Sequence, residues 1–140
     1  EEQLSDADLI IGAVLIPGAT APKLIDRKFL SKMKKSAVLV DVAIDQGGCF
    51  ETSKPTTHNE PTYVVDDIIH YCVANMPGSV PKTASNALNN VTGDYILKLA
   101  THGMSALKQD ENLAKGLNVS NGIITNDAVK SALGYTNSYN

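Results

Sequence analysis

The chain has 140 residues, of which 43% are hydrophobic and 19% charged, and this composition is typical of one modest soluble globular domain. The net charge of −3 gives no reason to expect nucleic acid or an anionic membrane surface as a partner, and no apolar run approaches the roughly 20 residues that span a bilayer. Two cysteines, Cys49 and Cys72, are too few for a disulfide scaffold and suit a reducing cytoplasm.

Residues 1–8 are mostly polar, lack an initiator methionine and lead directly into an apolar stretch. This pattern resembles the end of a helix and its loop inside a larger α/β domain, so we expect the chain to be a fragment of a longer protein. Residues 8–15 form a near-continuous apolar run, which predicts a parallel strand covered on both faces and ended by Pro17 and Gly18.

Residues 23–35 predict an amphipathic helix, opened near Pro22, with apolar side chains at helical spacing. Lys32, Lys34 and Lys35 fall near its expected C-terminus, where positive charge complements the helix dipole. We interpret these lysines as a solvated helix face, with a nucleotide-binding patch as the alternative.

Three further apolar runs predict strands, at residues 37–44 and 68–73 for buried strands and at 62–65 for an edge strand. Strands joined through a helix predict a right-handed parallel α/β sheet. Beyond Pro77 the pattern becomes helical, with a long helix over residues 81–100 in which Gly93 could introduce a bend. Shorter helices are expected at 104–108, 111–115 and 126–133, and a frayed tail at 135–140.

Ligands of open α/β sheets bind beyond the carboxyl ends of the strands. That rule selects Val14 and Leu15 with Pro17 and Gly18, then residues 43–45, then residues 74–76. Apolar groups there could enclose a flat ring such as nicotinamide, and Asp45 and Asn75 could supply polar contacts. The alternative, in which these are ordinary strand-to-loop transitions without a ligand, stays open at this point.

Asp45 is the candidate for chemistry, because it directly follows an apolar strand and precedes Gly47 and Gly48. A partly desolvated carboxylate there could carry a proton or stabilise charge. Its alternative is an Asx-turn that bonds the Gly47 amide. Asp41, in mid-strand, is interpreted as a structural residue that bonds a neighbouring backbone group.

We expect no metal site. The histidines at 58, 70 and 102 have no HxH or HExxH spacing, and the cysteines form no CxxC. Cys72 is interpreted as a core residue, and Cys49 has no activating histidine near it in sequence. The chain contains no Walker loop and no G-x-G-x-x-G, so a phosphate cradle would lie upstream of residue 1.

Four stretches together resemble the alanine dehydrogenases in order and spacing. They are Gly-Ala-Val-Leu-Ile-Pro-Gly-Ala at 12–19, Val-Asp-Val-Ala-Ile-Asp-Gln-Gly-Gly-Cys at 40–49, Pro-Thr-Thr at 55–57 and Tyr-Cys-Val-Ala-Asn-Met-Pro at 71–77. The resemblance extends to about Leu117. It implies that residues 1–76 are the C-terminal half of an NAD-binding Rossmann domain, and that residues 77–140 are a helical segment that packs with an absent catalytic domain.

The resemblance also implies the activity, a reversible NAD-dependent oxidative deamination of L-alanine to pyruvate and ammonium in the cytoplasm. Asp45 matches the family's catalytic aspartate, while its catalytic histidine and substrate-binding Arg and Lys would lie upstream, so the fragment alone should be inactive. The family commonly assembles as a homohexamer. The positions that match its cofactor contacts are Val14, Leu15, Val42, Ala43, Ile44, Asp45, Val73, Ala74, Asn75 and Met76.

Two alternatives remain. The NAD-binding subunit of the proton-translocating transhydrogenase shares the strand-Pro-Gly stretch, but it lacks an aspartate matching Asp45 and a pair matching Asn75 and Met76. The other alternative is a non-catalytic dinucleotide-binding module.

Overall fold

A computed structural model describes residues 2–135 of the chain, which divides into two units, Glu1–Ser79 and Val80–Asn140. Within the described residues, no helix combines the length and the apolar character that crossing a bilayer requires.

The first unit is built on a four-stranded sheet in the order β1-β2-β4-β3. Its strands are β1 (Leu9–Gly12), β2 (Val38–Asp41), β3 (Thr62–Val65) and β4 (Ile68–Tyr71). The first, second and fourth run parallel, and β3 is an antiparallel edge strand. The predicted α/β class and the edge position of residues 62–65 are therefore confirmed. The register sets Gly12 opposite Asp41 and Val40 opposite Tyr71, so the carboxyl ends of the three parallel strands share one edge.

The core of this unit lies against β2, with Leu30, Leu39, Phe50 and Ile68 almost fully buried. β1 differs from the prediction of a strand covered on both faces. It is the outer strand of the described sheet, and Leu9 and Ile11 are 54% and 60% exposed. The covered face of β1 explains Gly12, since a Cβ there would overlap Cys49 Sγ.

The prediction of a helix over residues 23–35 is wrong. Only α2 (Arg27–Leu30) is helical, and the Asp26 carboxylate caps it by accepting the Phe29 N–H at 2.8 Å. The residues before Asp26 are extended because they pair with a later segment, as the parallel bridge between Ile25 and Phe50 records. The lysines predicted for the helix C-terminus lie outside any helix, and exposed ion pairs join Lys34 to Asp8 and Lys35 to Asp67.

Strand boundaries also differ from the predictions. β1 ends at Gly12 instead of Leu15, and β2 ends at Asp41, where a 3-10 helix, η1 (Val42–Gln46), begins. β4 ends at Tyr71, and η2 (Met76–Ser79) closes the first unit. A short helix, α1 (Glu2–Ser5), precedes β1.

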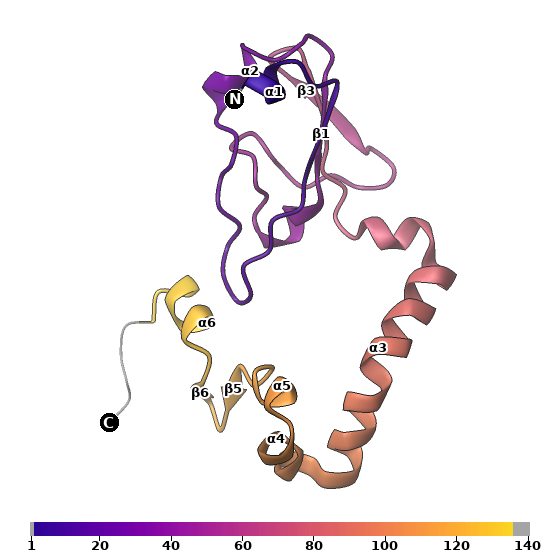
Figure 1. The fold of residues 1–140 in the computed structure, drawn as a ribbon, viewed down its shortest axis with the longest axis vertical. Helices are drawn as coiled ribbons and strands as arrows, with labels where there is room; N and C mark the ends of the chain where they lie inside the picture. Colours follow the sequence, from indigo (N-terminus) through magenta and orange to yellow (C-terminus); the bar gives the residue numbers. More distant parts are fainter. Residues whose placement is uncertain (1, 136–140) are drawn as a thin grey trace. The chain divides into compact units, whose positions relative to one another are not determined.

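The second unit opens with the predicted long helix, α3 (Pro81–His102), which continues through Gly93 without a break (Figure 1). It is followed by η3 (Gly103–Ser105), α4 (Ala106–Gln109), α5 (Glu111–Ala114) and α6 (Asp127–Ala132). Among the described residues of this unit only Ala106 is buried. The expectation of a frayed tail falls, beyond Tyr135, outside the described residues.

A small hairpin of β5 (Val119–Ser120) and β6 (Ile123–Ile124) was not predicted. Its turn is Asn121-Gly122, with φ angles of 50° and 80°. This Asn-Gly pair is a strong hairpin signal, because both residues tolerate the positive φ that the turn needs.

Candidate functional site

The predicted site residues all belong to segments that leave the same edge of the sheet. Residues 13–16 follow β1, η1 follows β2, and residues 72–75 follow β4 and lead into η2. Because the strand ends are in register, the topology brings together the three places that the sequence selected.

Asp45 lies within η1 and is exposed. Two details of the prediction are therefore wrong: Asp45 does not directly follow the strand, and its carboxylate is not desolvated in this chain. The Asx-turn alternative also fails, because the Gly47 N–H donates to the backbone carbonyl of Ile44 at 3.1 Å. Gly47 caps η1 in the left-handed conformation, with φ of 90°. Backbone hydrogen bonds therefore stabilise the turn, and the Asp45 carboxylate is left exposed to solvent.

Asp41 is fully buried at the end of β2, and it has the structural role predicted for it. Its carboxylate accepts the Cys49 N–H at 2.8 Å and the hydroxyl of Ser53, and the Cys49 thiol lies 3.4 Å from its other oxygen. These bonds fasten the far end of the loop that carries Asp45.

Cys49 is a buried thiol next to this carboxylate. Burial, together with the charge of Asp41, raises the pKa of Cys49 to about 11. The thiol therefore stays protonated near neutral pH, which does not suit a nucleophile.

The loop after β4 is held by His58, a contact that sequence reasoning missed. Its Nε2 lies 3.0 Å from the carbonyl of Asn75, and its Nδ1 lies 3.0 Å from the Ser79 hydroxyl. A carbonyl only accepts, so Nε2 carries the hydrogen. Asn75 adopts a left-handed φ of 56°. The parallel bridge between Thr56 and Val73 brings His58 to this loop, and no local sequence pattern predicts that pairing.

His70 is structural. It is fully buried, its Nδ1 lies 3.0 Å from the Ile68 carbonyl, and its Nε2 lies 2.7 Å from the Thr52 hydroxyl. Tyr63 stacks on its ring at 4.9 Å. Burial lowers the pKa of His70, so the ring is neutral near pH 7. Residues 2–135 contain no cluster of three or more His, Cys, Asp or Glu side chains that could hold a metal ion.

The ten predicted site residues differ in how they are presented. Leu15, Val42, Asp45 and Asn75 are exposed, and Val14, Ala74 and Met76 are half-buried. Ala43, Ile44 and Val73 are buried, so a ligand at the edge would reach them mainly through their backbone.

This set fits one half of a dinucleotide. The side chains of Leu15 and Val42 are 63% and 49% exposed, and such apolar surface suits the faces of a flat ring. Asp45 and Asn75 offer polar groups beside it. The sequence supplies no glycine-rich phosphate loop. The residues present therefore suit the ring half of the cofactor and leave the phosphates to other residues.

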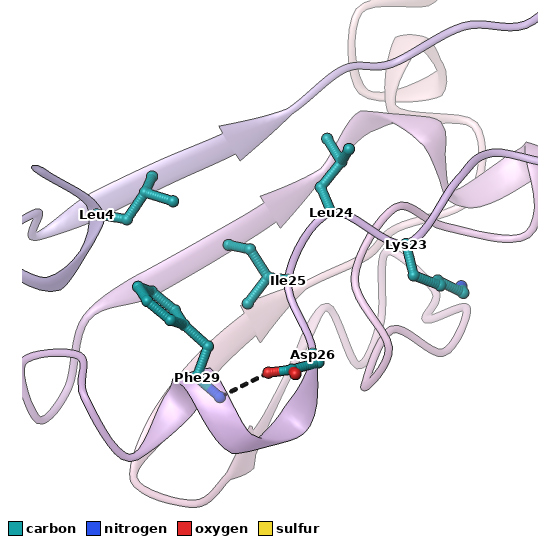
Figure 2. Close-up of a pocket in the computed structure, with 6 residues that line it drawn as sticks. All are labelled: Leu4, Lys23, Leu24, Ile25, Asp26 and Phe29. Atoms are coloured by element: carbon teal, nitrogen blue, oxygen red, sulfur yellow. Dashed lines mark hydrogen bonds between the residues drawn. The ribbon is translucent and has the colours of Figure 1, made fainter. Parts of the chain in front are cut away.

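Two hollows of the first unit lie away from the predicted site residues. One, of about 250 Å³, is shown in Figure 2 and is lined by Leu4, Lys23, Leu24, Ile25, Asp26 and Phe29. The other, of about 350 Å³, is lined by Leu30, Ser31, Met33, Lys35, Asp66, Asp67 and Ile68. Neither is lined by any of the ten predicted site residues.

Comparison with known proteins identifies the family of the chain. Residues 1–127 match the family model described as alanine dehydrogenase/PNT, C-terminal domain. An alanine dehydrogenase of Halomonas elongata is 62% identical over 135 residues, which are 96% of this chain and 36% of that protein. A solved L-alanine dehydrogenase structure superposes with a TM-score of 0.76 at 50% identity, covering 95% of this chain and 37% of that one.

A transhydrogenase from Sinorhizobium meliloti superposes less well, with a TM-score of 0.61 at 27% identity over 91% of this chain and 34% of that one. The fold defines an α/β unit with a mostly parallel four-stranded sheet, followed by a long helix. The chain belongs to the alanine dehydrogenase/PNT family, in the region of its C-terminal domain. It spans about a third of the length of the relatives it matches.

Proposed function

We propose that this chain is the C-terminal part of an NAD-dependent oxidoreductase that converts L-alanine reversibly to pyruvate and ammonium. The observation that carries the proposal is the placement of Asp45, an exposed carboxylate at the sheet edge where the segments after β1, β2 and β4 meet. Such an edge is where open α/β sheets bind their ligands.

The exposed apolar side chains at this edge would hold the nicotinamide end of NAD. Leu15 and Val42, with half-buried Val14 and Met76, offer the apolar contacts, and Asn75 offers an amide. When bound, NAD supplies the hydride acceptor, while the protein aligns the α-carbon of alanine with the ring.

The role assigned to Asp45 follows from the charge that develops on the substrate. After the alanine ammonium group has given up one proton to a base, loss of hydride from the α-carbon leaves a cationic imine, which water then hydrolyses. A carboxylate stabilises that positive charge and orients the attacking water. Closure of the site by the rest of the protein would desolvate Asp45 and strengthen this interaction.

The remaining partners lie outside these 140 residues. β1 is the outer strand of the described sheet, which suits further strands beside it, and exposed Leu9 and Ile11 leave one of its faces for further packing. We propose that residues 77–140 pack with a catalytic domain that supplies the histidine and the groups for the substrate carboxylate, within a homo-oligomer. Exposed apolar side chains on one face of α3 support this proposal; they are Leu88, Val91, Tyr95 and Leu99.

The test is Asp45→Asn in the full-length protein, because this change keeps the shape and removes the charge. Turnover should fall on the order of 100-fold or more. Folding should be normal, and NADH should bind within several-fold of wild type. Near-wild-type turnover would reduce Asp45 to a turn residue. Hydride exchange between NADH and an NADP analogue, without alanine turnover, would instead favour the transhydrogenase.

A further inference from the structure

Four successive backbone carbonyls after Asp45 are bonded by one short segment. The Gln46 carbonyl accepts the Ala21 N–H at 2.9 Å, and the Cys49 carbonyl accepts the Leu24 N–H at 2.7 Å. The two carbonyls between them, of Gly47 and Gly48, accept hydrogen bonds from one ammonium group, the Nζ of Lys23, at 2.6 and 2.7 Å. Figure 2 shows the Lys23 side chain directed away from the other side chains that line the hollow.

The Lys23 ammonium bonds the two carbonyls that lie between the two backbone hydrogen bonds. Pro22 has no N–H, and Gly47 and Gly48 have φ angles of 90° and 73°, which turn their carbonyls out of a regular ladder. An ammonium has three donors on a flexible stem, so it can reach both oxygens at once. Lys23 therefore supplies the two middle hydrogen bonds between residues 21–24 and residues 46–49.

The Gly47-Gly48 turn is also packed closely on two sides. A Cβ on Gly48 would come within 2.8 Å of an Asp41 carboxylate oxygen, and one on Gly47 within 2.8 Å of the Thr20 methyl group. The Gly-Gly turn is thus confined between buried Asp41 on one side and the segment around Lys23 on the other.

We infer that Lys23 is a positioning residue for Asp45. The carbonyl of Gly47, the residue that caps η1, lies only two residues beyond Asp45, and Lys23 fixes it. The segment that carries Lys23 also continues from the loop after β1, which contains Val14 and Leu15. One side chain therefore ties together two of the loops at the proposed cofactor edge. This inference rests on the proposed function.

The experiment uses the full-length protein with three substitutions at this position. Lys23→Met keeps the length of the stem and removes the donors, and we expect kcat to fall about tenfold or more, since small displacements of reacting groups are costly. Lys23→Arg restores charged donors and should recover most of the loss, with Lys23→Gln between them. Lys35→Met is the matched control, because it removes an exposed lysine paired with Asp67, and it should leave kcat unchanged.

A double mutant separates positioning from general stability. If Lys23 acts through Asp45, then Lys23→Met should lower kcat little further in an Asp45→Asn background. An equal loss in both backgrounds, or wild-type kcat in Lys23→Met, would overturn the inference.

Amide hydrogen exchange keeps the inference distinct from the proposed function. Residues 43–48 should exchange faster in Lys23→Met than in Lys35→Met, whether or not the wild-type protein oxidises alanine. Unchanged exchange would refute the positioning role. A wild-type protein without alanine-dependent NADH formation would refute the proposed function alone.

Discussion

At the scale of single residues, buried polar groups hold the loops of the first unit in place. Asp41 and His70 are both fully buried, and each is bonded on two sides. A buried polar group that loses its partners costs about 1–3 kcal/mol, so such bonds specify one loop arrangement. Asp45 is the contrast, since its exposed carboxylate leaves its charge available for chemistry.

His70 makes the stability of the chain dependent on pH. Its pKa is lowered in the folded state by burial, whereas an unfolded histidine titrates near pH 6.5. As the pH falls below about 6.5, His70 takes up a proton in the unfolded chain before it does so in the folded chain. The free energy of unfolding therefore decreases as the pH falls from the unfolded-state pKa to the lower folded-state pKa. The urea midpoint should therefore fall between pH 7.5 and pH 5. A His70→Gln variant whose midpoint falls just as steeply would show that other groups cause the effect.

At the scale of elements, β1 depends on its close approach to the segment around Phe50. A Cβ on Gly12 would overlap Cys49 Sγ and come within 2.7 Å of the Phe50 ring. Gly12→Ala should therefore lower the free energy of unfolding by about 1–3 kcal/mol, the usual effect of overpacking. Denaturant unfolding of the 140-residue chain measures it.

Gly93→Ala provides the control, since nothing lies within 4 Å of a Cβ there and alanine favours a helix interior. Helix content should be kept or increased. If Gly12→Ala unfolds at the wild-type midpoint, the close contact between β1 and the Cys49–Phe50 segment is not as tight as the structure has it.

Sequence patterns predicted those elements that a run of apolar residues or a helical spacing marks locally. The apolar runs at β2 and β4 and the helical spacing of α3 fall into this group. The helix expected at 23–35 failed because tertiary pairing with residues 46–51 overrides the local preference. The positions of the site loops could be predicted because each loop directly follows a strand. The contacts of Lys23 and His58 that hold these loops could not be predicted, because they depend on tertiary pairing. Those contacts join residues 17 to 25 positions apart.

At the scale of the whole molecule, the two units differ in how well they are buried. The first has a continuous core around Leu39 and Phe50, whereas only Ala106 is buried among the described residues of the second. A 22-residue helix without a buried side chain gains little from packing within this chain. This contrast is the basis for proposing that α3 packs on a catalytic domain outside the 140 residues.

That proposal predicts opposite outcomes for one substitution in two contexts. Leu88 is 63% exposed, so Leu88→Lys in the 140-residue chain should leave helix content, measured by circular dichroism, unchanged. In the full-length protein the lysine would have to lose water at the interface, and stability should fall by about 2 kcal/mol, with loss of assembly in size-exclusion chromatography. Asn90→Lys is the matched control, since residue 90 is exposed and lies about 200° further around the helix. If both variants behave alike in the full-length protein, the Leu88 face of α3 is not the surface that packs on the catalytic domain.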